Sequence, residues 1–365
     1  MSLSFDLVPG TPVTAPEEIA RVLSQDPGFG IHFSDHMALA TWTDGIGWHD
    51  DQVTAYAPFQ VDPGDAVLHY AQEIFEGLKA YRHADGSIWL FRPEKNAQRF
   101  IRSAERMDLP RLEAEDFITA VTAVTRADAA WVPGAEEQSL YIRPFMFAAE
   151  SFLGVRSAKT VTFATIAGPA GAYFKTGLSP VDIWVTTTWS RAGDGGTGAA
   201  KCGGNYASSL IAGKEAYAHG CGQVLFTDAA THSWLEELGG MNVFIVTQAG
   251  ELVTPPTSGT ILDGVTRDSI LQLAPRFGLK PVERPIALAE LLEGIASGAI
   301  PEAFACGTAA VITPISAFRY AADGGDQDAT LANPFGQATA ALRRQLVDIQ
   351  WGRAADEFGW TTRVA

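Results

Sequence analysis

The stretch G-D-G-G-T-G-A-A-K-C-G-G-N-Y, residues 193–206, combines many small side chains with one long cationic side chain. Six of its fourteen residues are glycine, two are alanine, and the cation is Lys201. Small residues leave room for a flat group beside the backbone, and a lysine that is buried there becomes a usable nucleophile or base. The competing interpretation is a solvated surface loop with an idle lysine, because glycine-rich loops are common.

The composition is typical of a well-packed globular enzyme. Of 365 residues, 47% are hydrophobic and 19% are charged, and a chain of this length favours two domains. The formal net charge of -16 argues against a nucleic-acid-binding protein, which needs a basic face. Cys202, Cys221 and Cys306 match no metal-ligand spacing and cannot all pair. Without a disulfide framework, a signal-peptide pattern or a long apolar run, the sequence predicts a cytoplasmic protein that does not span a membrane.

Strand and helix patterns are mixed along the chain without strict alternation. Strands are predicted at 67–70, 78–82, 87–91, 139–148, 160–167, 181–189, 222–227 and 241–247. Helices are predicted from Pro93, at about 113–130, from Tyr206 to His219, from near Gly264 and over 334–351, whereas the first 30 residues are predicted to be irregular. The fold class is therefore α/β or α+β in each half. The segment 171–180 is the expected interdomain loop between domains over 1–170 and 181–365.

A dinucleotide-binding motif is one alternative for the glycine stretch. Gly193, Gly195 and Gly198 match the G-x-G-x-x-G pattern, follow a predicted strand and precede an acid, Asp228, at the end of the next strand. In that motif the helix begins within the glycine pattern, so that its N-terminus faces the pyrophosphate. The further glycines at 203 and 204 would weaken such a helix by about 1 kcal/mol each relative to alanine. The match on its own is weak, and an NAD-dependent oxidoreductase stays a remote alternative.

Pyridoxal phosphate explains more of the chain. This cofactor needs a lysine, an acid for the pyridine nitrogen, a phosphate cradle and a group near its phenolic oxygen. Lys201 supplies the amine, Tyr206 can serve the phenolic oxygen, and the pair Glu236-Glu237 stands at the entrance to a strand. The helix start in G-V-T-R-D, residues 264–268, offers backbone N–H groups to a phosphate. C-G-T-A-A, residues 306–310, is a second source of such donors.

Motifs along nearly the whole chain resemble those of the branched-chain amino acid aminotransferases in their longer form. The matching segments are F-G-I-H-F-S-D-H-M (29–37), Y-A-Q-E-I-F-E-G-L-K-A-Y (70–81), F-R-P-E-K-N-A-Q-R-F (91–100), Y-I-R-P-F (141–145), P-A-G-A-Y-F-K (169–175), A-A-K-C-G-G-N-Y (199–206), E-L-G-G-M-N (237–242), G-V-T-R-D (264–268) and A-C-G-T-A-A (305–310). The resemblance implies a class IV aminotransferase of fold type IV, with a smaller α/β N-terminal domain and a larger C-terminal pseudo-barrel domain that carries the Schiff-base lysine. The cofactor should sit between the two domains.

The resemblance also implies an activity. It is the reversible ping-pong transfer of an amino group from L-leucine, L-isoleucine or L-valine to 2-oxoglutarate, in a cytoplasmic homodimer. Another fold type IV enzyme, such as a D-amino acid aminotransferase, is the closer alternative.

The site residues follow from the same resemblance. Lys201 is the catalytic residue, which carries the cofactor and moves a proton between the substrate Cα and C4′ of the cofactor. The implied cofactor-binding residues are Arg99, Lys201, Tyr206, Glu237, Leu262, Gly264, Val265, Thr266 and Thr308. The implied substrate-binding residues are Phe29, Tyr70, Phe75, Tyr141, Arg143, Leu153, Val155, Tyr173, Thr308 and Ala309. Arg143 would help to receive the second carboxylate of glutamate, and the loop with Leu153 and Val155 would reach into the site of the partner subunit.

Two departures from the family pattern are visible. Gly240 stands where the longer eukaryotic forms often have a threonine. Ala310 and Thr313 stand where some relatives have a Cys-x-x-Cys pair, so a redox switch of that kind is absent. Cys306 is therefore expected to be a buried packing residue.

Overall fold

The computed structural model describes residues 2–171 and 179–365, which form two compact units. The first unit comprises the described residues through 171 together with Ala200–Gly203 and Asp348–Ala365, and the second comprises 179–199 and Gly204–Val347. Most of the predicted interdomain loop, 171–180, lies outside the described residues. Because two later segments return to the first unit, that unit is the longer of the two over the described residues.

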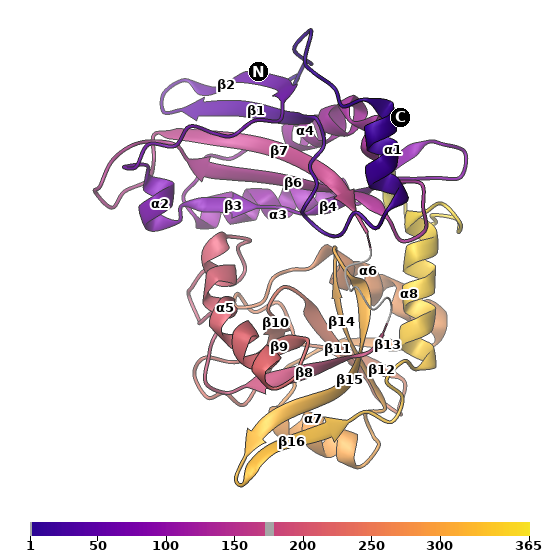
Figure 1. The fold of residues 1–365 in the computed structure, drawn as a ribbon. Coiled ribbons are helices and arrows are strands. Elements are labelled where there is room, and N and C mark those ends of the chain that lie inside the picture. Colours follow the sequence, from indigo (N-terminus) through magenta and orange to yellow (C-terminus); the bar gives the residue numbers. More distant parts are fainter. Residues whose placement is uncertain (1, 172–178) are drawn as a thin grey trace. The chain divides into compact units, whose positions relative to one another are not determined.

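An antiparallel sheet of eight strands forms the body of the first unit (Figure 1). Its strands are β1 (His36–Thr43), β2 (Gly47–Ala55), β3 (Glu73–Phe75), β4 (Leu78–Arg82), β5 (Ile88–Phe91), β6 (Ser139–Ala148), β7 (Thr160–Ala170) and β17 (Thr361–Arg363). They run in the order β17-β5-β4-β6-β7-β1-β2, and β3 also pairs with β6. The predicted strands at 78–82 and 139–148 are confirmed, and Gly86, with φ +85°, makes the turn between β4 and β5.

Helices bury the apolar side of this sheet. They are α1 (Pro16–Ser24), α2 (Ala66–Tyr70), α3 (Pro93–Arg106) and α4 (Ala114–Ala127), followed by the 3-10 turn η1 (Ala129–Trp131). Phe100 of α3 lies 5.2 Å from Phe117 of α4 and 5.8 Å from Phe163 of β7, measured between ring centroids. These three buried rings join the two helices to the sheet, which fixes the position of α3.

Two elements of the first unit differ from the prediction. The segment predicted as a strand at 67–70 is the short helix α2, which ends at Ala71 in a left-handed conformation with φ 48°. The first 30 residues, predicted to be irregular, contain α1, which begins at Pro16 and buries Ile19 and Val22. A proline at the first helical position and two apolar residues three positions apart favour α1 only weakly. Its packing against the rest of the unit supplies the remaining stability.

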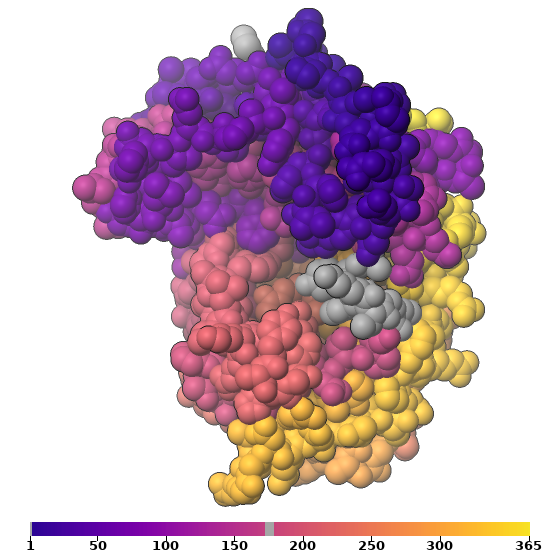
Figure 2. Space-filling view, viewed as in Figure 1, coloured from indigo at the N-terminus to yellow at the C-terminus, as the bar shows by residue number. Residues whose placement is uncertain are grey.

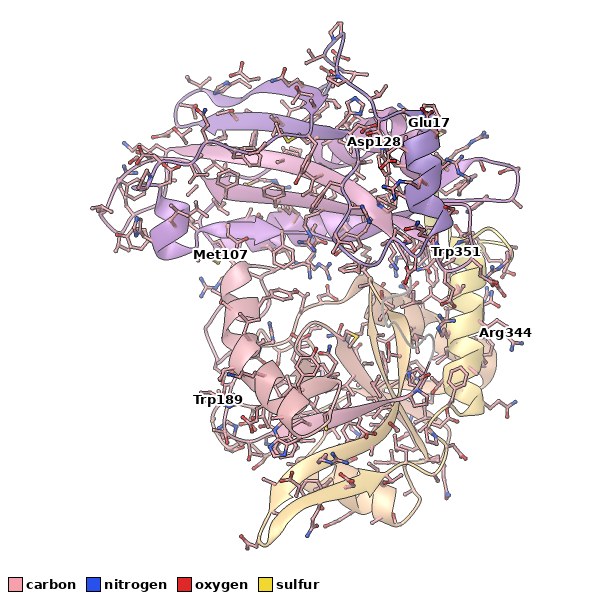
Figure 3. The ribbon with its side chains drawn as sticks, in the orientation of Figure 1. Glu17, Met107, Asp128, Trp189, Arg344 and Trp351 are labelled. Atoms are coloured by element: carbon pink, nitrogen blue, oxygen red, sulfur yellow. The ribbon has the colours of Figure 1, made fainter. Side chains whose placement is uncertain are left out.

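The C-terminal segment belongs to the first unit through direct packing. β17 pairs with β5, and the ring of Trp351, labelled in Figure 3, lies 4.5 Å from that of Tyr81 on β4. Trp351 follows α8 (Gln337–Gln350), the final helix predicted over 334–351. The last strand of the first sheet is therefore added only after the chain has completed the second unit.

A mixed sheet of nine strands forms the second unit. Its strands are β8 (Val181–Thr186), β9 (Gln223–Thr227), β10 (Leu235–Leu238), β11 (Asn242–Val246), β12 (Glu251–Thr254), β13 (Lys280–Glu283), β14 (Glu302–Gly307), β15 (Val311–Ala322) and β16 (Gly325–Thr330). β8 pairs in parallel with β9 and β15, and β12 pairs in parallel with β13, whereas the other pairs are antiparallel. The hairpin of β15 and the exposed β16 projects from the rest of this unit (Figure 2).

The helices of the second unit are α5 (Gly203–Ala218), α6 (Val265–Leu273), the 3-10 turn η2 (Ala274–Phe277), α7 (Leu288–Ala296) and most of α8. α5 begins three residues before the predicted Tyr206. The curled mixed sheet with helices packed on it agrees with the predicted α/β (α+β) class (Figure 1). Across the described residues, no helix is both long and apolar enough to cross a membrane.

Candidate active site

The peptide of Lys201 is held from both sides within the first unit. The backbone N–H of Lys201 donates to Ser103 Oγ at 3.0 Å, and its carbonyl accepts from Phe75 N–H at 2.9 Å. Its Nζ lies 4.8 Å from the centroid of the Phe75 ring. Glu73 accepts a hydrogen bond from the N–H of Gly203, two residues further on. The lysine thus stands on a fixed backbone rather than on a loose surface loop.

Arg99 lies on the same face of α3 as Ser103, one helical turn earlier. Its Nε and Nη2 donate to the two carboxylate oxygens of Glu76 at 2.7 and 2.8 Å, and both side chains are buried. Asn96 donates to the same carboxylate at 2.7 Å. Burial alone would raise the pKa of Glu76, but Arg99, Lys201 and Asn96 outweigh it and hold that pKa below its usual value. The bidentate pair fixes the plane of the guanidinium.

A pocket of about 230 Å³ in the first unit brings predicted substrate residues together. Its lining residues are Phe29, Gly30, His32, Phe33, Tyr141, Arg143, Ile166, Ala167 and Gly168. The Arg143 guanidinium lies over the rings of Phe75 and Tyr141, at 4.8 and 5.4 Å from their centroids. Its buried Nε has no hydrogen-bond partner among the described residues. The pocket is aromatic, with one cation at its wall.

The remaining predicted substrate residues of the first unit lie at its surface. The hydroxyl of Tyr70 donates to the carbonyl of Leu153. The side chains of Leu153 and Val155 are 72% and 88% exposed. Neither Tyr70 nor this loop lines the pocket around Arg143. Tyr173 lies outside the described residues.

Glu237 occupies a buried polar position in the second unit. It lies on β10 with its side chain 4% exposed, and its Oε1 is 2.7 Å from Nη2 of Arg191. Oε1 also accepts the backbone N–H of Leu262 at 2.9 Å, and Oε2 accepts from Nδ2 of Asn242 at 3.1 Å. Its neighbour Glu236 is also buried, and burial raises its pKa. A carboxylate with as many donors as Glu237 has is well suited to remain an anion.

The turn that leads into α6 is tied to the same carboxylate. Asn242 donates to the carbonyl of Leu262 at 3.0 Å as well as to Glu237. A Cβ on Gly264 would lie 2.1 Å from Oδ1 of Asn242, so only glycine allows this approach. Val265 and Thr266 then begin α6 and are buried. The N-terminus of α6 is thereby set at a fixed position relative to Glu237, and a helix N-terminus favours an anion.

Tyr206, Thr308 and Ala309 lie in the second unit as well. Tyr206 is on the first turn of α5, and a Cβ on Gly240 would be 3.7 Å from its ring, an ordinary contact. Thr308 and Ala309 lie in the turn between β14 and β15, just after Cys306, which pairs with Asn242 across β14 and β11. Cys306 is fully buried, as predicted. The described residues contain no cluster of side chains suited to a metal ion.

The glycine stretch has structural roles other than dinucleotide binding. α5 begins at Gly203, five residues after Gly198, so no helix starts inside the 193–198 pattern. Gly195 has φ +73°, and a Cβ on Gly198 would lie 2.4 Å from the backbone of Thr260. These glycines serve a turn and a close backbone contact, which removes the basis of the oxidoreductase alternative.

The structure brings the predicted residues together in two sets, one in each unit. Lys201, Arg99 and Phe75 are neighbours in the first unit, and Glu237, Leu262 and Gly264 are linked in the second. Sequence reasoning missed the residues that hold these sets. They are Glu76, Asn96, Ser103, Arg191 and Asn242. Glu76, Asn96 and Asn242 lie within matched motifs, but nothing in their spacing indicated which residues they contact.

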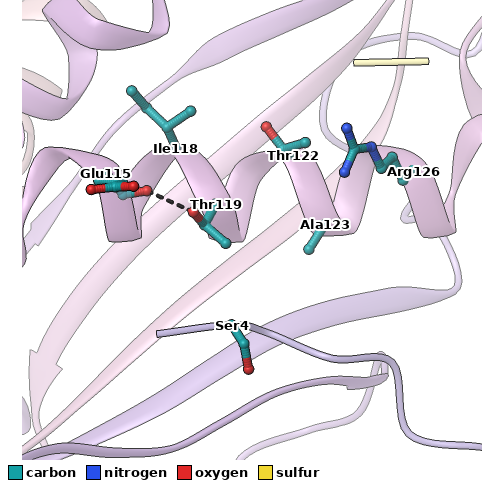
Figure 4. A pocket seen from close by; sticks show the side chains of 7 residues that line it. All are labelled: Ser4, Glu115, Ile118, Thr119, Thr122, Ala123 and Arg126. Carbon is teal, nitrogen blue, oxygen red and sulfur yellow. Dashed lines mark hydrogen bonds between the residues drawn. The ribbon is translucent and has the colours of Figure 1, made fainter. Parts of the chain in front are cut away.

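A further depression of about 420 Å³ lies along α4 (Figure 4). Its lining residues are Ser4, Glu115, Ile118, Thr119, Thr122, Ala123 and Arg126. Thr119 donates to the carbonyl of Glu115 within the helix at 2.8 Å. No predicted site residue lines this depression.

Comparisons with known proteins agree with this geometry. The family model described as amino-transferase class IV matches residues 73–318. A probable branched-chain-amino-acid aminotransferase of Streptomyces coelicolor is 48% identical over 363 residues, covering 99% of each chain. The branched-chain-amino-acid aminotransferase of Mycobacterium tuberculosis H37Rv is 49% identical over 344 residues, covering 93% of each chain.

Solved structures are similar over most of the chain. The branched-chain amino acid aminotransferase of Escherichia coli superposes with a TM-score of 0.74 at 28% identity, over 90% of this chain and all of that chain. The T.th. enzyme of the same name, in complex with N-(5'-phosphopyridoxyl)-L-glutamate, gives 0.70 at 25% identity, over 90% and 99%. That enzyme with pyridoxamine 5'-phosphate gives 0.71 at 26% identity, again over 90% and 99%. The chain belongs to the class IV aminotransferases and, within them, to the branched-chain-amino-acid aminotransferases.

Proposed function

We propose that this protein transfers the amino group of L-leucine, L-isoleucine or L-valine reversibly to 2-oxoglutarate, with Lys201 as its catalytic residue. The observation that carries the proposal is the anchoring of the Lys201 peptide by Ser103 and Phe75, beside the buried Arg99–Glu76 pair. Among the relatives named above, each is a branched-chain-amino-acid aminotransferase, which favours this activity over a D-amino acid aminotransferase.

The cofactor is pyridoxal 5′-phosphate, which the family uses and whose pyridoxamine form occupies a solved neighbour. When bound, it supplies an electrophilic carbonyl carbon and a ring that accepts electrons. The donor set fits it, since the chain offers an amine, a fixed guanidinium, a buried carboxylate and the N-terminus of α6. The residues proposed to hold it are Arg99, Lys201, Tyr206, Glu237, Leu262, Gly264, Val265, Thr266 and Thr308.

Each group has a distinct task in this proposal. Arg99 and the N–H groups at the start of α6 bind the phosphate, because a guanidinium keeps its charge and a helix N-terminus attracts anions. Glu237 pairs with the ring nitrogen, and Tyr206 with the phenolic oxygen. The Nζ of Lys201 takes a proton from the substrate Cα and delivers one on the return path.

The substrate residues supply shape and charge. The aromatic pocket lined by Phe29 and Tyr141, with Phe75 beside Arg143, suits a branched aliphatic side chain, since such pockets are mostly apolar. Arg143, at the wall of this pocket, is proposed to receive the second carboxylate of glutamate or 2-oxoglutarate. The other substrate residues, Tyr70, Leu153, Val155, Tyr173, Thr308 and Ala309, stay predictions from the family resemblance.

Arg143 can be tested through two substrates of the same enzyme. Arg143→Gln should lower kcat/KM for L-glutamate by about 10- to 100-fold, since a hydrogen bond to a charged group contributes roughly 1.5–3 kcal/mol. L-Leucine, with no second carboxylate, should be affected much less. Equal losses for both substrates in steady-state assays would contradict this role.

The protein is further proposed to act as a cytoplasmic homodimer. The exposed apolar side chains of the first unit include Ile31, Phe33, Tyr56, Phe59, Leu68, Leu153 and Val155. The side chains of Leu153 and Val155 are 72% and 88% exposed. Apolar surface of this kind is unfavourable in water unless another protein surface covers it. A second copy of the chain is proposed to cover them.

Sedimentation should show a dimer. The double substitution Leu153→Asp with Val155→Asp should weaken this dimer, whereas Ile46→Asp, at an isoleucine of the β1–β2 turn with 72% exposure, should leave it intact.

The direct test of the activity is spectroscopic. Purified protein reconstituted with pyridoxal phosphate should acquire the absorption of a lysine-bound cofactor, and L-leucine should change it. Lys201→Ala should abolish that absorption and the activity with L-leucine and 2-oxoglutarate, whereas Lys214→Ala, at an exposed lysine of α5, should keep both. A protein that cannot bind pyridoxal phosphate, or that prefers D-alanine to L-leucine, would refute the proposal.

A further inference from the structure

Arg191 is a buried cation at the centre of the polar network of the second unit. It lies between β8 and α5 and is 7% exposed. Its Nη2 is 2.7 Å from Oε1 of Glu237, and the same nitrogen donates to the carbonyls of Gly198, at 3.0 Å, and Thr260. Its own carbonyl accepts from Ser208 Oγ at 3.1 Å. One side chain therefore joins β10, the glycine loop and the segment before α6.

The backbone around Arg191 is built to hold it. A Cβ on Gly198 would lie 2.4–2.7 Å from the backbone of Thr260, so the two backbones approach as closely as glycine permits. This contact places the carbonyls of Gly198 and Thr260 side by side on the guanidinium. The loop is closed by Asn205, which donates to the carbonyl of Thr197 at 2.8 Å. Two carbonyls thus hold the guanidinium in addition to its carboxylate partner.

Two carboxyl groups compete for this single cation. Glu237 makes the direct contact, whereas the buried Glu236 interacts with the side chain of Thr260 and has an Oε2 without a hydrogen-bond partner among the described residues. Burial raises the pKa of Glu236, and the charge of Arg191 offsets only part of that rise. The direct contact with Arg191 therefore belongs to Glu237, whereas Glu236 interacts with Thr260 instead.

We propose that Arg191 is a positioning residue that keeps Glu237 an anion and so keeps the shared proton on the ring nitrogen of the cofactor. This inference rests on the proposed role of Glu237. A carboxyl group and a ring nitrogen that share one proton can be either a carboxylate with a protonated ring or a carboxylic acid with a neutral ring. A fixed positive charge beside the carboxyl group favours the first arrangement, because the carboxylate is then negatively charged and is attracted to the cation.

The experiment measures the proton directly. Holoenzyme is reconstituted with pyridoxal phosphate labelled with 15N in the ring, and the 15N chemical shift reports whether the nitrogen is protonated. The wild-type enzyme should show a protonated nitrogen. Arg191→Gln should move the shift toward that of a neutral ring, whereas Arg191→Lys, which retains the charge, should keep the nitrogen protonated. Arg284→Gln removes an arginine from the partly exposed pair with Glu290 and should leave the shift unchanged.

Kinetics provide a second readout. Arg191→Gln should lower kcat for L-leucine by about 10- to 100-fold, a range found when the partner that orients a site residue is removed, with little change in KM. Arg191→Lys should recover part of kcat. A purely structural role would instead lower the folded fraction in both variants and leave the 15N shift of the folded fraction unchanged.

The outcomes separate the proposals. A ring that stays protonated in Arg191→Gln, or loses its proton equally in Arg191→Lys, overturns the role of Arg191. If Arg191→Gln does not fold, Arg191→Lys decides: a protonated ring supports the inference and a neutral ring refutes it. A wild-type enzyme with a neutral ring also refutes it. A wild-type enzyme that binds no pyridoxal phosphate refutes the proposed function instead.

Discussion

Each unit contains a buried arginine–glutamate pair, but the two pairs divide their tasks in opposite ways. In the first unit Arg99 is the proposed ligand-binding member, and Glu76 fixes it with help from Asn96. In the second unit Glu237 is the proposed ligand-binding member, and Arg191 fixes it from a loop. An ion pair by itself therefore does not identify its functional member, and the surrounding donors and acceptors have to be considered.

The local structures differ as well. Arg99 stands on α3, and its partner follows β3, so regular elements set their distance. Arg191 comes from a loop that needs Gly198 and the carbonyl of Thr260 to hold it. A pair carried by a loop depends on more separate contacts, so it should be easier to perturb from a distance.

The largest expected effect on stability comes from the first pair. Glu76→Gln removes the carboxylate that pairs with the buried Arg99 and that lies near the charge of Lys201. Removing one partner of a buried pair costs about 3–5 kcal/mol, so urea unfolding should show a loss of that order. Glu18→Gln, which breaks the exposed pair with Arg21, is the control and should leave the free energy of unfolding nearly unchanged. Similar losses for both variants would show that the buried pair contributes little.

The second pair should matter more for catalysis. Glu237→Gln should lower kcat by about 100- to 1,000-fold, the range for removal of one preorganised electrostatic contact in a dry site. It should also change the absorption of the bound cofactor, whereas Glu76→Gln should chiefly weaken cofactor affinity through Arg99. Identical spectra for wild type and Glu237→Gln would show that the two pairs do not differ in the way described.

A smaller effect is expected from a methyl group placed beside the second pair. Gly264→Ala would put its Cβ 2.1 Å from Oδ1 of Asn242 and so displace a donor to Glu237. Overpacking of this kind costs about 1–3 kcal/mol, and thermal unfolding should detect it. Gly240→Ala is the control, since its Cβ would meet Tyr206 at 3.7 Å, and it should change stability by less than about 0.5 kcal/mol. Equal destabilisation by both variants would argue against the role of Asn242.

The smallest effect concerns Glu236 and its dependence on pH. Burial raises its pKa above the usual 4.5, so the folded state binds a proton more readily than the unfolded state. Its contribution to stability is present below pH 4.5 and is lost as pH rises through the raised pKa. Glu236→Gln should remove this loss and stabilise the protein slightly at neutral pH, as urea titrations at several pH values can show.

The opposite sign is expected for Glu76. Its pKa lies below the usual value, so its stabilising contribution is present above pH 4.5 and is lost as pH falls through the lowered pKa. The same urea titrations on Glu76→Gln should therefore show a smaller loss of stability toward acid pH than wild type shows. An unchanged acid limb in Glu76→Gln, or an unchanged neutral limb in Glu236→Gln, would contradict these assignments.

Much of the fold could be predicted from the sequence, and the failures have identifiable causes. The burial of side chains alternates along β6, and both ends of this strand, 139 and 148, were predicted correctly. The Asp85-Gly86 turn indicated the hairpin of β4 and β5. The prediction for 67–70 was wrong because its apolar residues fit either period, and its helical form depends on the left-handed Ala71. α1 was missed because its stability comes from burying Ile19 and Val22.

The sequence by itself determined the family, the cofactor chemistry and the residues that could bear it, because motifs record which side chains occur at which spacing. Lys201, Arg99 and Glu237 were all identifiable in this way. Only the tertiary structure decided what holds them: Ser103 and Phe75 at the lysine, Glu76 at Arg99, and Arg191 and Asn242 at Glu237. Ser103, for example, lies 98 positions from Lys201, and no local pattern encodes such a contact. The same holds for the glycine stretch. Position 198 requires glycine because the backbone of Thr260 lies against it, and only the folded chain brings these two segments together.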